Sequence, residues 1–168
     1  MSPRRLILVA LVVLAVAAPQ SALAATYGDT VSGYEYYATS TDGRFAGTAS
    51  GSLPGAWNAN VQHTALCISC TPTATITGGT FALSTTLHSV PTVVTGKFTG
   101  GAINVTNVGT GCTKQTFAIK GKLTHVGPWN QGVGSGTFTA TLTHYRHSIL
   151  GHCITYAASV SGTLSLSF

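Results

Sequence analysis

The sequence has very few acidic side chains. Among 168 residues there are three, Asp29, Glu35 and Asp42, and charged residues of both signs make up only 7% of the chain. Few residues are therefore available for catalysis by paired carboxylates, as in glycoside hydrolysis. Asp42-Gly43 is typical of a tight turn, whereas Glu35 falls within a predicted strand. The sequence leaves enzymatic activity open, but it identifies no catalytic residue, no metal site and no cofactor.

Basic residues are also sparse, and two of the eight lie in a predicted export signal. Arg4 and Arg5 precede an apolar run over residues 6–18 and the small-residue sequence Ala-Leu-Ala at 22–24, which together are typical of a secretory signal peptide. We therefore predict a signal peptide at 1–24 and a single all-β domain at 25–168. The domain has six basic and three acidic residues, a balance too weak for nucleic-acid binding. We expect a secreted, extracellular protein, or a periplasmic one in a Gram-negative bacterium.

Helical periodicity is lacking after residue 25, and alternation of apolar and polar residues takes its place. Thr and Ser, with 27 and 15 residues, occupy most of the polar positions, and β-branched Thr suits a pleated, half-buried surface. This alternation predicts antiparallel strands with one buried face. The predicted inward row contains Phe117, Ile119, Gly121, Leu123, Phe138, Ala140, Leu142, Ile154, Tyr156, Ala158, Val160, Gly162, Leu164, Leu166 and Phe168.

Turn signals divide the chain into about nine candidate strands. They cover residues 31–39, 44–53, 57–68, 73–84, 92–99, 102–108, 113–125, 136–146 and 153–168, with Gly100-Gly101 taken as a turn. Gly96, Gly121 and Gly162 are predicted to point inward and to make room for bends or large neighbours, as a small barrel requires. We predict a single small antiparallel meander that closes, or nearly closes, into a β-barrel of 8–9 strands. The alternative is a two-sheet β-sandwich.

Four cysteines behind an export signal predict two disulfides. Connections in a meander alternate between its two ends, and a strand of about nine residues spans ~30 Å, which no disulfide can bridge. With Gly100-Gly101 as a turn, Cys67 and Cys70 lie at one end, and Cys112 and Cys153 at the other. We therefore predict the pairs Cys67–Cys70 and Cys112–Cys153, although a bulge at Gly100-Gly101 would reverse every later strand. A redox use of the first pair is disfavoured because a strand follows it, not a helix. Zinc binding by this pair with His63 is disfavoured because the ligand spacing is loose and an oxidising compartment competes for the thiols.

Polar residues gather where one inward row ends. His144 and Arg146 continue the row of Phe138, Ala140 and Leu142, and His152 follows after a short turn. Ligand-binding residues of the predicted barrel mouth are His144, Arg146, His152 and Tyr156, and the count of connections adds His88 and Trp57 at the same end. Strand ends also become polar where they meet water, so a purely structural role fits the same residues. His63 is predicted to be a hydrogen-bonded core histidine.

Two predicted turns combine tryptophan with amide side chains. Trp57 precedes Asn58, and Trp129 precedes Asn130 and Gln131. Indole rings stack on sugars while amides hydrogen-bond to them, but the same residues can also cap the end of a barrel. We include Trp57 and Trp129 among the candidate ligand-binding residues.

Three functions remain open. The first is a secreted, disulfide-stapled barrel that binds a small molecule or a glycan without catalysis. The second is an outer-membrane barrel, because apolar residues alternate up to the terminal Phe168; membrane association is nevertheless disfavoured, because Thr and Lys occupy the opposite face. The third is a structural or surface-interaction protein that uses the outward row of Thr137, Thr139, Thr141 and Thr143. The ligand, the oligomeric state and any glycosylation of Asn104 stay open.

Overall fold

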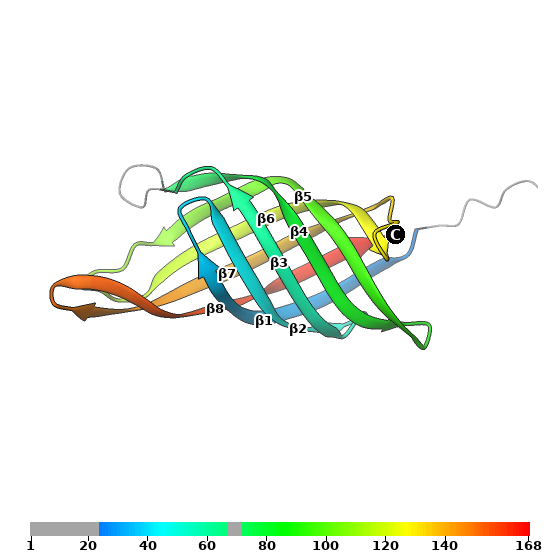
Figure 1. Ribbon diagram of the computed structural model, residues 1–168, viewed down its shortest axis with the longest axis horizontal. Helices are drawn as coiled ribbons and strands as arrows, with labels where there is room; N and C mark the ends of the chain where they lie inside the picture. Colours follow the sequence, from blue (N-terminus) through cyan, green and yellow to red (C-terminus); the bar gives the residue numbers. More distant parts are fainter. Residues whose placement is uncertain (1–23, 67–71) are drawn as a thin grey trace, which may run out of the picture.

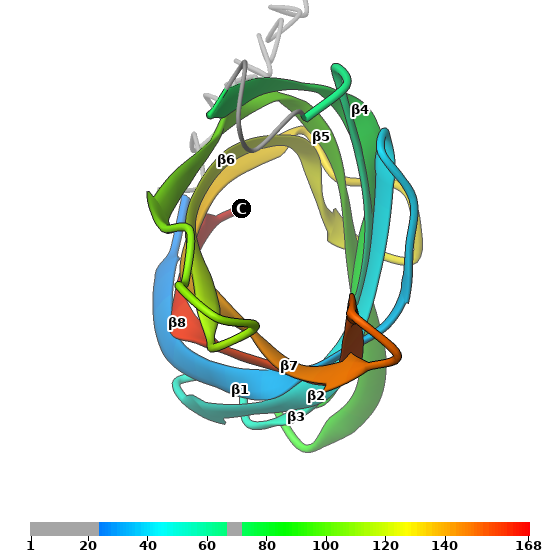
Figure 2. The same cartoon turned by 90° about the vertical axis from the view of Figure 1, so that its left-hand side faces the viewer.

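The computed structural model describes residues 24–66 and 72–168, which form an antiparallel barrel of eight strands (Figure 1). The strands are β1 (Thr26–Ala38), β2 (Asp42–Gly51), β3 (Gly55–His63), β4 (Thr73–Leu87), β5 (Val90–Asn107), β6 (Gln115–Pro128), β7 (Gly134–Ile149) and β8 (His152–Ser167). Each strand pairs with the next, and β8 pairs with β1, which closes the ring seen in Figure 2. The predicted barrel is confirmed in place of the sandwich. Within the described ranges, no helix is long and apolar enough to cross a bilayer.

The inward rows are apolar, because side chains alternate across each strand and the barrel interior excludes water. The predicted inward residues of β6 and β7 are confirmed: Phe117, Ile119, Leu123, Phe138, Ala140 and Leu142 are all buried. Outward rows carry hydroxyl groups that pair across strands. The Thr30 and Ser50 hydroxyls are 2.8 Å apart, and those of Ser32 and Thr48 are 3.3 Å apart. Hydroxyls thus connect neighbouring strands on the outer surface.

Inward glycines leave room for large aromatic side chains, as predicted. A Cβ atom added at Gly121 would lie 2.6 Å from the ring of Phe98. A Cβ at Gly47 would collide with the Ser32 carbonyl oxygen on the facing strand. The close approach of β1 and β2 at this point lets the indole N–H of Trp57 donate to the carbonyl oxygens of Ser32 and Thr48, at 3.2 and 3.1 Å.

Gly100-Gly101 forms part of an irregularity within β5, and the prediction of a turn there was wrong. The β5–β6 register shifts between Phe98 and Gly100, and β5 continues to Asn107. Gly101 has a φ of 132°, a conformation that suits glycine and lets the strand bend without ending. Every later strand therefore runs opposite to the predicted direction.

This reversal fixes the two ends of the barrel. The disulfide end carries the connections β1–β2, β3–β4, β5–β6 and β7–β8; the terminal end carries the other three connections and Phe168 (Figure 1). Cys112 and Cys153 form a disulfide with a Cα–Cα distance of 5.2 Å, so this predicted pair is confirmed. The argument from opposite ends was wrong, because the β3–β4 connection reaches the same end. Cys67 and Cys70 lie outside the described residues.

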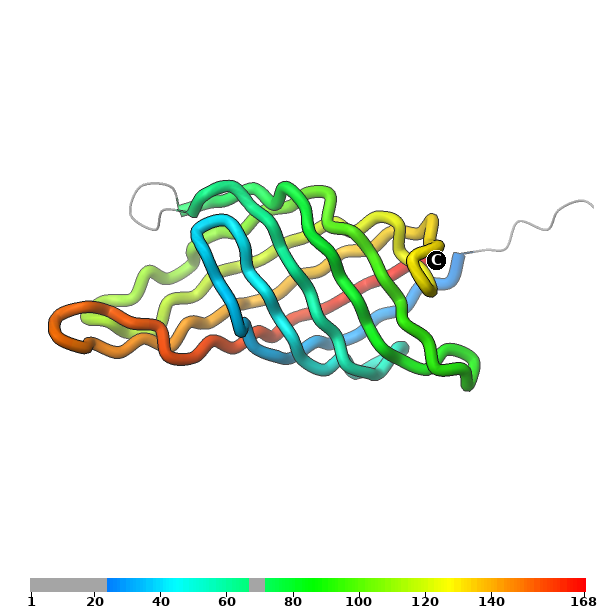
Figure 3. Tube along the Cα trace, in the orientation of Figure 1, coloured from blue at the N-terminus to red at the C-terminus, as the bar shows by residue number. Residues whose placement is uncertain are grey.

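The hairpin of β7 and β8 projects beyond the rest of the barrel at the disulfide end (Figure 3). The β7–β8 register shifts between Tyr145 and Arg146, where Tyr156 is the extra residue of β8. The predicted inward phase therefore fails in this part of β8: Tyr156 is 69% exposed and Ile154 is also exposed. Val160, Leu164 and Leu166, which lie in the closed part of the barrel, are buried as predicted.

Candidate functional site

A cavity of about 180 Å³ lies inside the barrel at the disulfide end. Its walls come from residues of six strands, β1, β2, β3, β5, β6 and β7, so its shape is set mainly by the sheet. The apolar wall consists of Phe45, Val61, Ile103, Phe117, Ile119 and Leu142. The rim comes from the β1–β2 hairpin and Leu66, and it adds the hydroxyl side chains of Thr39 and Ser40. The arrangement is an apolar chamber with a polar rim.

One acid–base pair interrupts the apolar wall. The Nε2–H of His144 on β7 donates to Oε2 of Glu35 on β1 at 2.6 Å. The side chains are 17% and 7% exposed, respectively. Phe117 packs against the imidazole, with ring centroids 5.0 Å apart. A short charge-assisted hydrogen bond between poorly exposed partners holds both side chains in place.

Strand irregularities flank both members of this pair. The β1–β2 register shifts between Glu35 and Tyr37, directly after the glutamate, and the β7–β8 shift follows His144 by one residue. Bulges bend strands and redirect side chains, and they are frequent next to functional sites. Pairing of β1 with β8 extends only to Gly33 and Val160. Glu35 therefore reaches His144 where the β1–β8 ladder has ended.

A groove lies on the outside of the barrel at this break in the ladder. It is lined by Glu35, Tyr36, Tyr37, Ala38, His144 and residues 155–158 of β8. Glu35, Ala38 and His144 line both this groove and the interior cavity. The acid–base pair therefore lies at the boundary between the chamber and the outer surface.

Two further titratable residues line the cavity, and each has its own partner. Asp42 lies 3.3 Å from the Nε of Arg44, in an exposed ion pair. His63 is half-buried, and its Nδ1–H donates to the carbonyl oxygen of Thr64 at 2.8 Å. His63 is hydrogen-bonded as predicted, but it lies at the cavity rim and not in the packed core.

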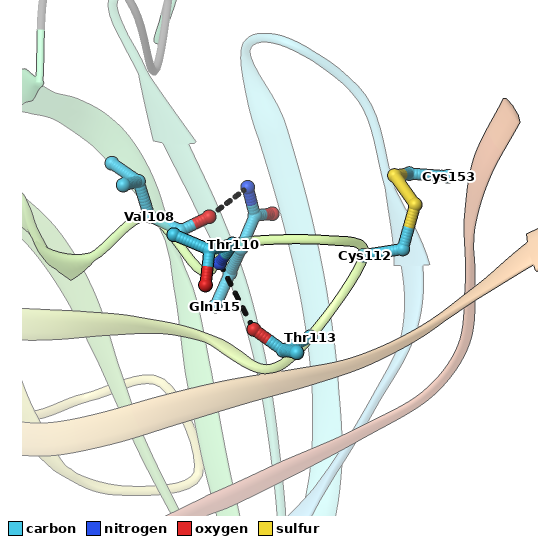
Figure 4. The surroundings of a disulfide bond; sticks show 6 residues. All are labelled: Val108, Thr110, Cys112, Thr113, Gln115 and Cys153. Atoms are coloured by element: carbon cyan, nitrogen blue, oxygen red, sulfur yellow. Dashed lines mark hydrogen bonds between the residues drawn. A yellow bond between two sulfur atoms is a disulfide. The ribbon is translucent and has the colours of Figure 1, made fainter.

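At the same end of the barrel, the disulfide holds the β5–β6 connection against the projecting hairpin (Figure 4). Within the connection, the backbone N–H of Thr110 donates to the Thr113 hydroxyl at 3.0 Å, and Gln115 Nε2 donates to the Val108 carbonyl oxygen at 3.1 Å. Gln115 is buried and pairs with His144 in the β6–β7 register. Gln115 therefore contacts both the loop that carries Cys112, through its side chain, and His144 on β7, through the strand pairing.

The predicted ligand-binding residues separate into two groups. His144 lines the cavity, and Tyr156 lines the outer groove without pointing inward. Arg146 is half-buried and His152 is exposed on the β7–β8 hairpin. Trp57, His88 and Trp129 belong to the terminal half. The predicted proximity of Trp57 and His88 to His144 was therefore wrong. That prediction relied on the turn at Gly100-Gly101.

The two tryptophans differ in exposure. Trp57 is 2% exposed and packs inside the barrel, with its N–H bonded to two backbone carbonyls, so its indole is not available to a ligand at the surface. Trp129 is 59% exposed in the β6–β7 turn. It borders a shallow groove with Pro54, Pro91 and Thr92 at the terminal end.

Glu35 is the functional candidate that the sequence analysis missed. The sequence presents Glu35 only as one of three carboxylates, too few to favour glycoside hydrolysis. Glu35 and Asp42 do line the same cavity, but they have different partners. Glu35 follows Gly33 by two residues and Val31 by four, so it continues the inward row of β1. This alternation is the sequence pattern that could have identified it. An acidic residue in an inward apolar row needs a partner, because burial without one is costly.

The chain matches no protein-family model, no curated protein and no solved structure. Its function has to be inferred from the site itself.

Proposed function

We propose that this is a secreted, disulfide-stapled barrel that binds a small, mainly apolar molecule in the cavity at its disulfide end. The observation that carries the proposal is the apolar chamber of about 180 Å³ with Glu35 and His144 in its wall. An apolar cavity of about 150 Å³ in another protein suffices to bind benzene. The chamber therefore has room for a molecule of one or two small rings or a short chain.

The acid–base pair gives this ligand an orientation. Binding sites usually combine an apolar lining with a few polar groups that fix the ligand's direction. A ligand hydroxyl or N–H can donate to the Glu35 carboxylate, which has lone pairs beyond the one used by His144. A sugar would leave most of its hydroxyls unpaired against Phe45, Val61 and Ile119, so the lining favours an apolar ligand over a glycan.

Naphthol is a suitable probe, because it is small, apolar and fluorescent and carries one hydroxyl. Wild-type protein should bind it saturably, with the emission shift of an apolar environment. Leu142→Phe should abolish binding, because the larger side chain enters the empty chamber and not packed atoms. Thr141→Phe is the matched control, since this neighbouring side chain is exposed. Absence of saturable binding to wild type, or equal binding by both variants, would contradict the proposal.

The distribution of side chains favours this proposal over an outer-membrane barrel. Barrels that face lipid carry an apolar outer band and a polar interior. Here the exposed rows contain Thr30, Thr139, Lys120 and Ser165, whereas Phe138, Leu142 and Leu164 point into the barrel. For the third alternative, the hydroxyl pairs Thr30–Ser50 and Ser32–Thr48 link β1 to β2, so outward Thr and Ser residues can serve the sheet itself without a binding partner.

A second candidate function is glycan binding at Trp129. The exposed indole borders a groove that also contains Ser84, Thr86 and Thr92, and this combination suits a sugar ring. Trp129→Ala should remove binding to an oligosaccharide array. Val133→Ala in the same turn is the control, because Val133 is likewise an exposed apolar residue. If wild type binds no glycan on the array, this candidate is eliminated and the cavity proposal is unaffected.

A further inference from the structure

The imidazole of His144 is oriented by a carboxylate. Its Nε2–H is engaged by Glu35 at 2.6 Å, so in the neutral ring the other nitrogen, Nδ1, carries a lone pair. Within residues 24–66 and 72–168, no group hydrogen-bonds to this Nδ1. A carboxylate that fixes the tautomer of a histidine and stabilises its protonated form is the arrangement that prepares an imidazole for general-base catalysis.

The location of the pair fits such a role. His144 and Glu35 line the apolar chamber, and Phe117 packs against the imidazole ring. Electrostatic interactions are stronger in a chamber of low polarity than in water, so the Glu35 charge acts strongly on a developing imidazolium. His63, the other histidine of the cavity, donates through Nδ1 to a backbone carbonyl and has no carboxylate partner among the described residues.

We propose that His144 acts as a general base, positioned by Glu35, that removes a proton from a carbon atom of a small apolar molecule in the cavity. The inference rests on the proposed binding function and extends it to catalysis. The substrate class is a small apolar β,γ-unsaturated carbonyl compound, whose acidic C–H bond lies between the carbonyl group and a C=C double bond. The reaction class is isomerisation by proton transfer.

The step balances without a co-reactant. The C–H bond breaks and its proton forms a bond with Nδ1, while the electron pair is delocalised onto the carbonyl oxygen. The imidazolium keeps its Nε2–H bond to Glu35, and Glu35 accepts no proton in the reaction. Return of the proton from Nδ1 to a different carbon shifts the double bond and regenerates the neutral imidazole. Nothing is oxidised or reduced overall.

Nitrobenzisoxazole tests the base directly, because it is a small, apolar C–H acid whose reaction requires only proton removal. The base takes the proton, the electron pair completes a carbon–nitrogen triple bond, and the nitrogen–oxygen bond breaks to release a coloured phenolate. Wild-type protein should show saturable turnover that naphthol inhibits competitively. The turnover should exceed that of free imidazole at the same concentration.

His144→Gln is the decisive variant, because its amide N–H can still donate to Glu35 while the base is lost. General-base catalysis contributes about 10²–10⁴-fold, so kcat should fall by about 100-fold or more while naphthol binding persists. Glu35→Gln should lower kcat with little change in KM, since it removes the charge that stabilises the imidazolium. His147→Gln is the matched control, because this exposed residue of β7 lines neither the cavity nor the groove.

The outcomes separate this inference from the binding function. Naphthol binding without turnover above free imidazole would overturn the catalytic role and leave the binding function standing. Unchanged turnover in His144→Gln, or its loss in His63→Gln alone, would place the base elsewhere and also overturn it. Absence of naphthol binding and of turnover would contradict both proposals. A fall in kcat for His144→Gln with retained naphthol affinity and an unchanged unfolding midpoint supports the inference.

Discussion

The two ends of the barrel follow the same alternation of inward and outward residues, but they use the interior differently. The terminal half is filled by aromatic rings: Phe138 lies 5.8 Å from Trp57 and 6.2 Å from Phe98, measured between ring centroids. Leu53, from the β2–β3 connection, is buried there, and its backbone N–H donates to the buried Asp29 carboxylate at 2.8 Å. The packed half provides a rigid base for the rest of the barrel.

In the disulfide half, the inward side chains surround a cavity and do not fill the centre of the barrel. Its inward residues leave a cavity of about 180 Å³, and its polar groups form a pair at the cavity wall. The Cys112–Cys153 disulfide at this end supplies a covalent constraint where packing is less complete than at the other end. If the proposed binding function holds, the stability commonly lost at ligand sites is lost in this one half of the barrel.

Two phenylalanines on neighbouring strands measure the contrast between the halves. Phe138→Ala should destabilise the protein by about 3–5 kcal/mol, because it leaves a void among packed rings. Phe117→Ala should cost clearly less, since Phe117 already borders empty space, although both residues are buried. Urea unfolding at equilibrium measures both values. Equal losses would show that the disulfide half is as tightly packed as the terminal half.

Removal of the crosslink should mainly affect the disulfide half. The disulfide joins residues separated by 41 positions, and Cys112→Ser with Cys153→Ser should cost about 2–4 kcal/mol of unfolding free energy. Amide hydrogen exchange should accelerate in the β5–β6 connection and the β7–β8 hairpin before it does so around Trp57. Uniform acceleration across all eight strands would mean that the two halves do not differ in local stability.

The inward apolar rows of β6 and β7 could be predicted from the sequence because they depend on local alternation. Phe117, Ile119 and Leu123, with Phe138 and Leu142, keep an uninterrupted period of two over most of their strands. Each of these side chains points inward whichever way the strand runs. The fold class and the core therefore did not depend on knowing the number of strands.

Irregularities in the strands could not be predicted, because their sequence signals are ambiguous. Gly100-Gly101 suits either a turn or a bulge, and only its pairing with Lys122 and Gly121 on β6 decides between them. The extra residue at Tyr156 leaves no signal at all in the alternation. One wrong assignment put His144 and its neighbours at the end that carries Trp57 and His88, whereas the Cys112–Cys153 pair was still predicted correctly because both cysteines were reversed together.

The Glu35–His144 pair depends on closure of the barrel. The two residues are separated by 109 positions, and they lie on strands that both neighbour β8. His144 was predicted from its local cluster of polar residues, but its partner becomes evident only when β1 meets β8. Long-range closure thus creates the candidate site that no single segment of the sequence contains.

Gly121, an inward glycine, provides a further test of how tightly the aromatic core is packed. Gly121→Ala should cost about 1–3 kcal/mol, because the added Cβ would lie 2.6 Å from the Phe98 ring and the aromatic core has no space to yield. Gly100→Ala is the matched control, since nothing lies within 4 Å of the Cβ added there. Thermal unfolding of the two variants provides the measurement. A cost at Gly100 equal to that at Gly121 would show that backbone freedom, and not ring packing, requires these glycines.

Substitutions on the outer surface should change the unfolding free energy least. The change should be the same in both halves of the barrel, except where like charges face each other. Thr141→Lys should change the unfolding free energy by no more than about 0.5 kcal/mol, because Thr141 is exposed and faces Ala118 and Ser161 in the ladder. Thr139→Lys should cost about 0.2–1 kcal/mol more, because Thr139 faces Lys120 directly and like charges repel across strands. The difference should disappear in high salt, which screens exposed charges. Naphthol binding should remain unchanged in both variants. A difference in unfolding free energy that persists at high salt would show that the Thr139 side chain contributes by packing.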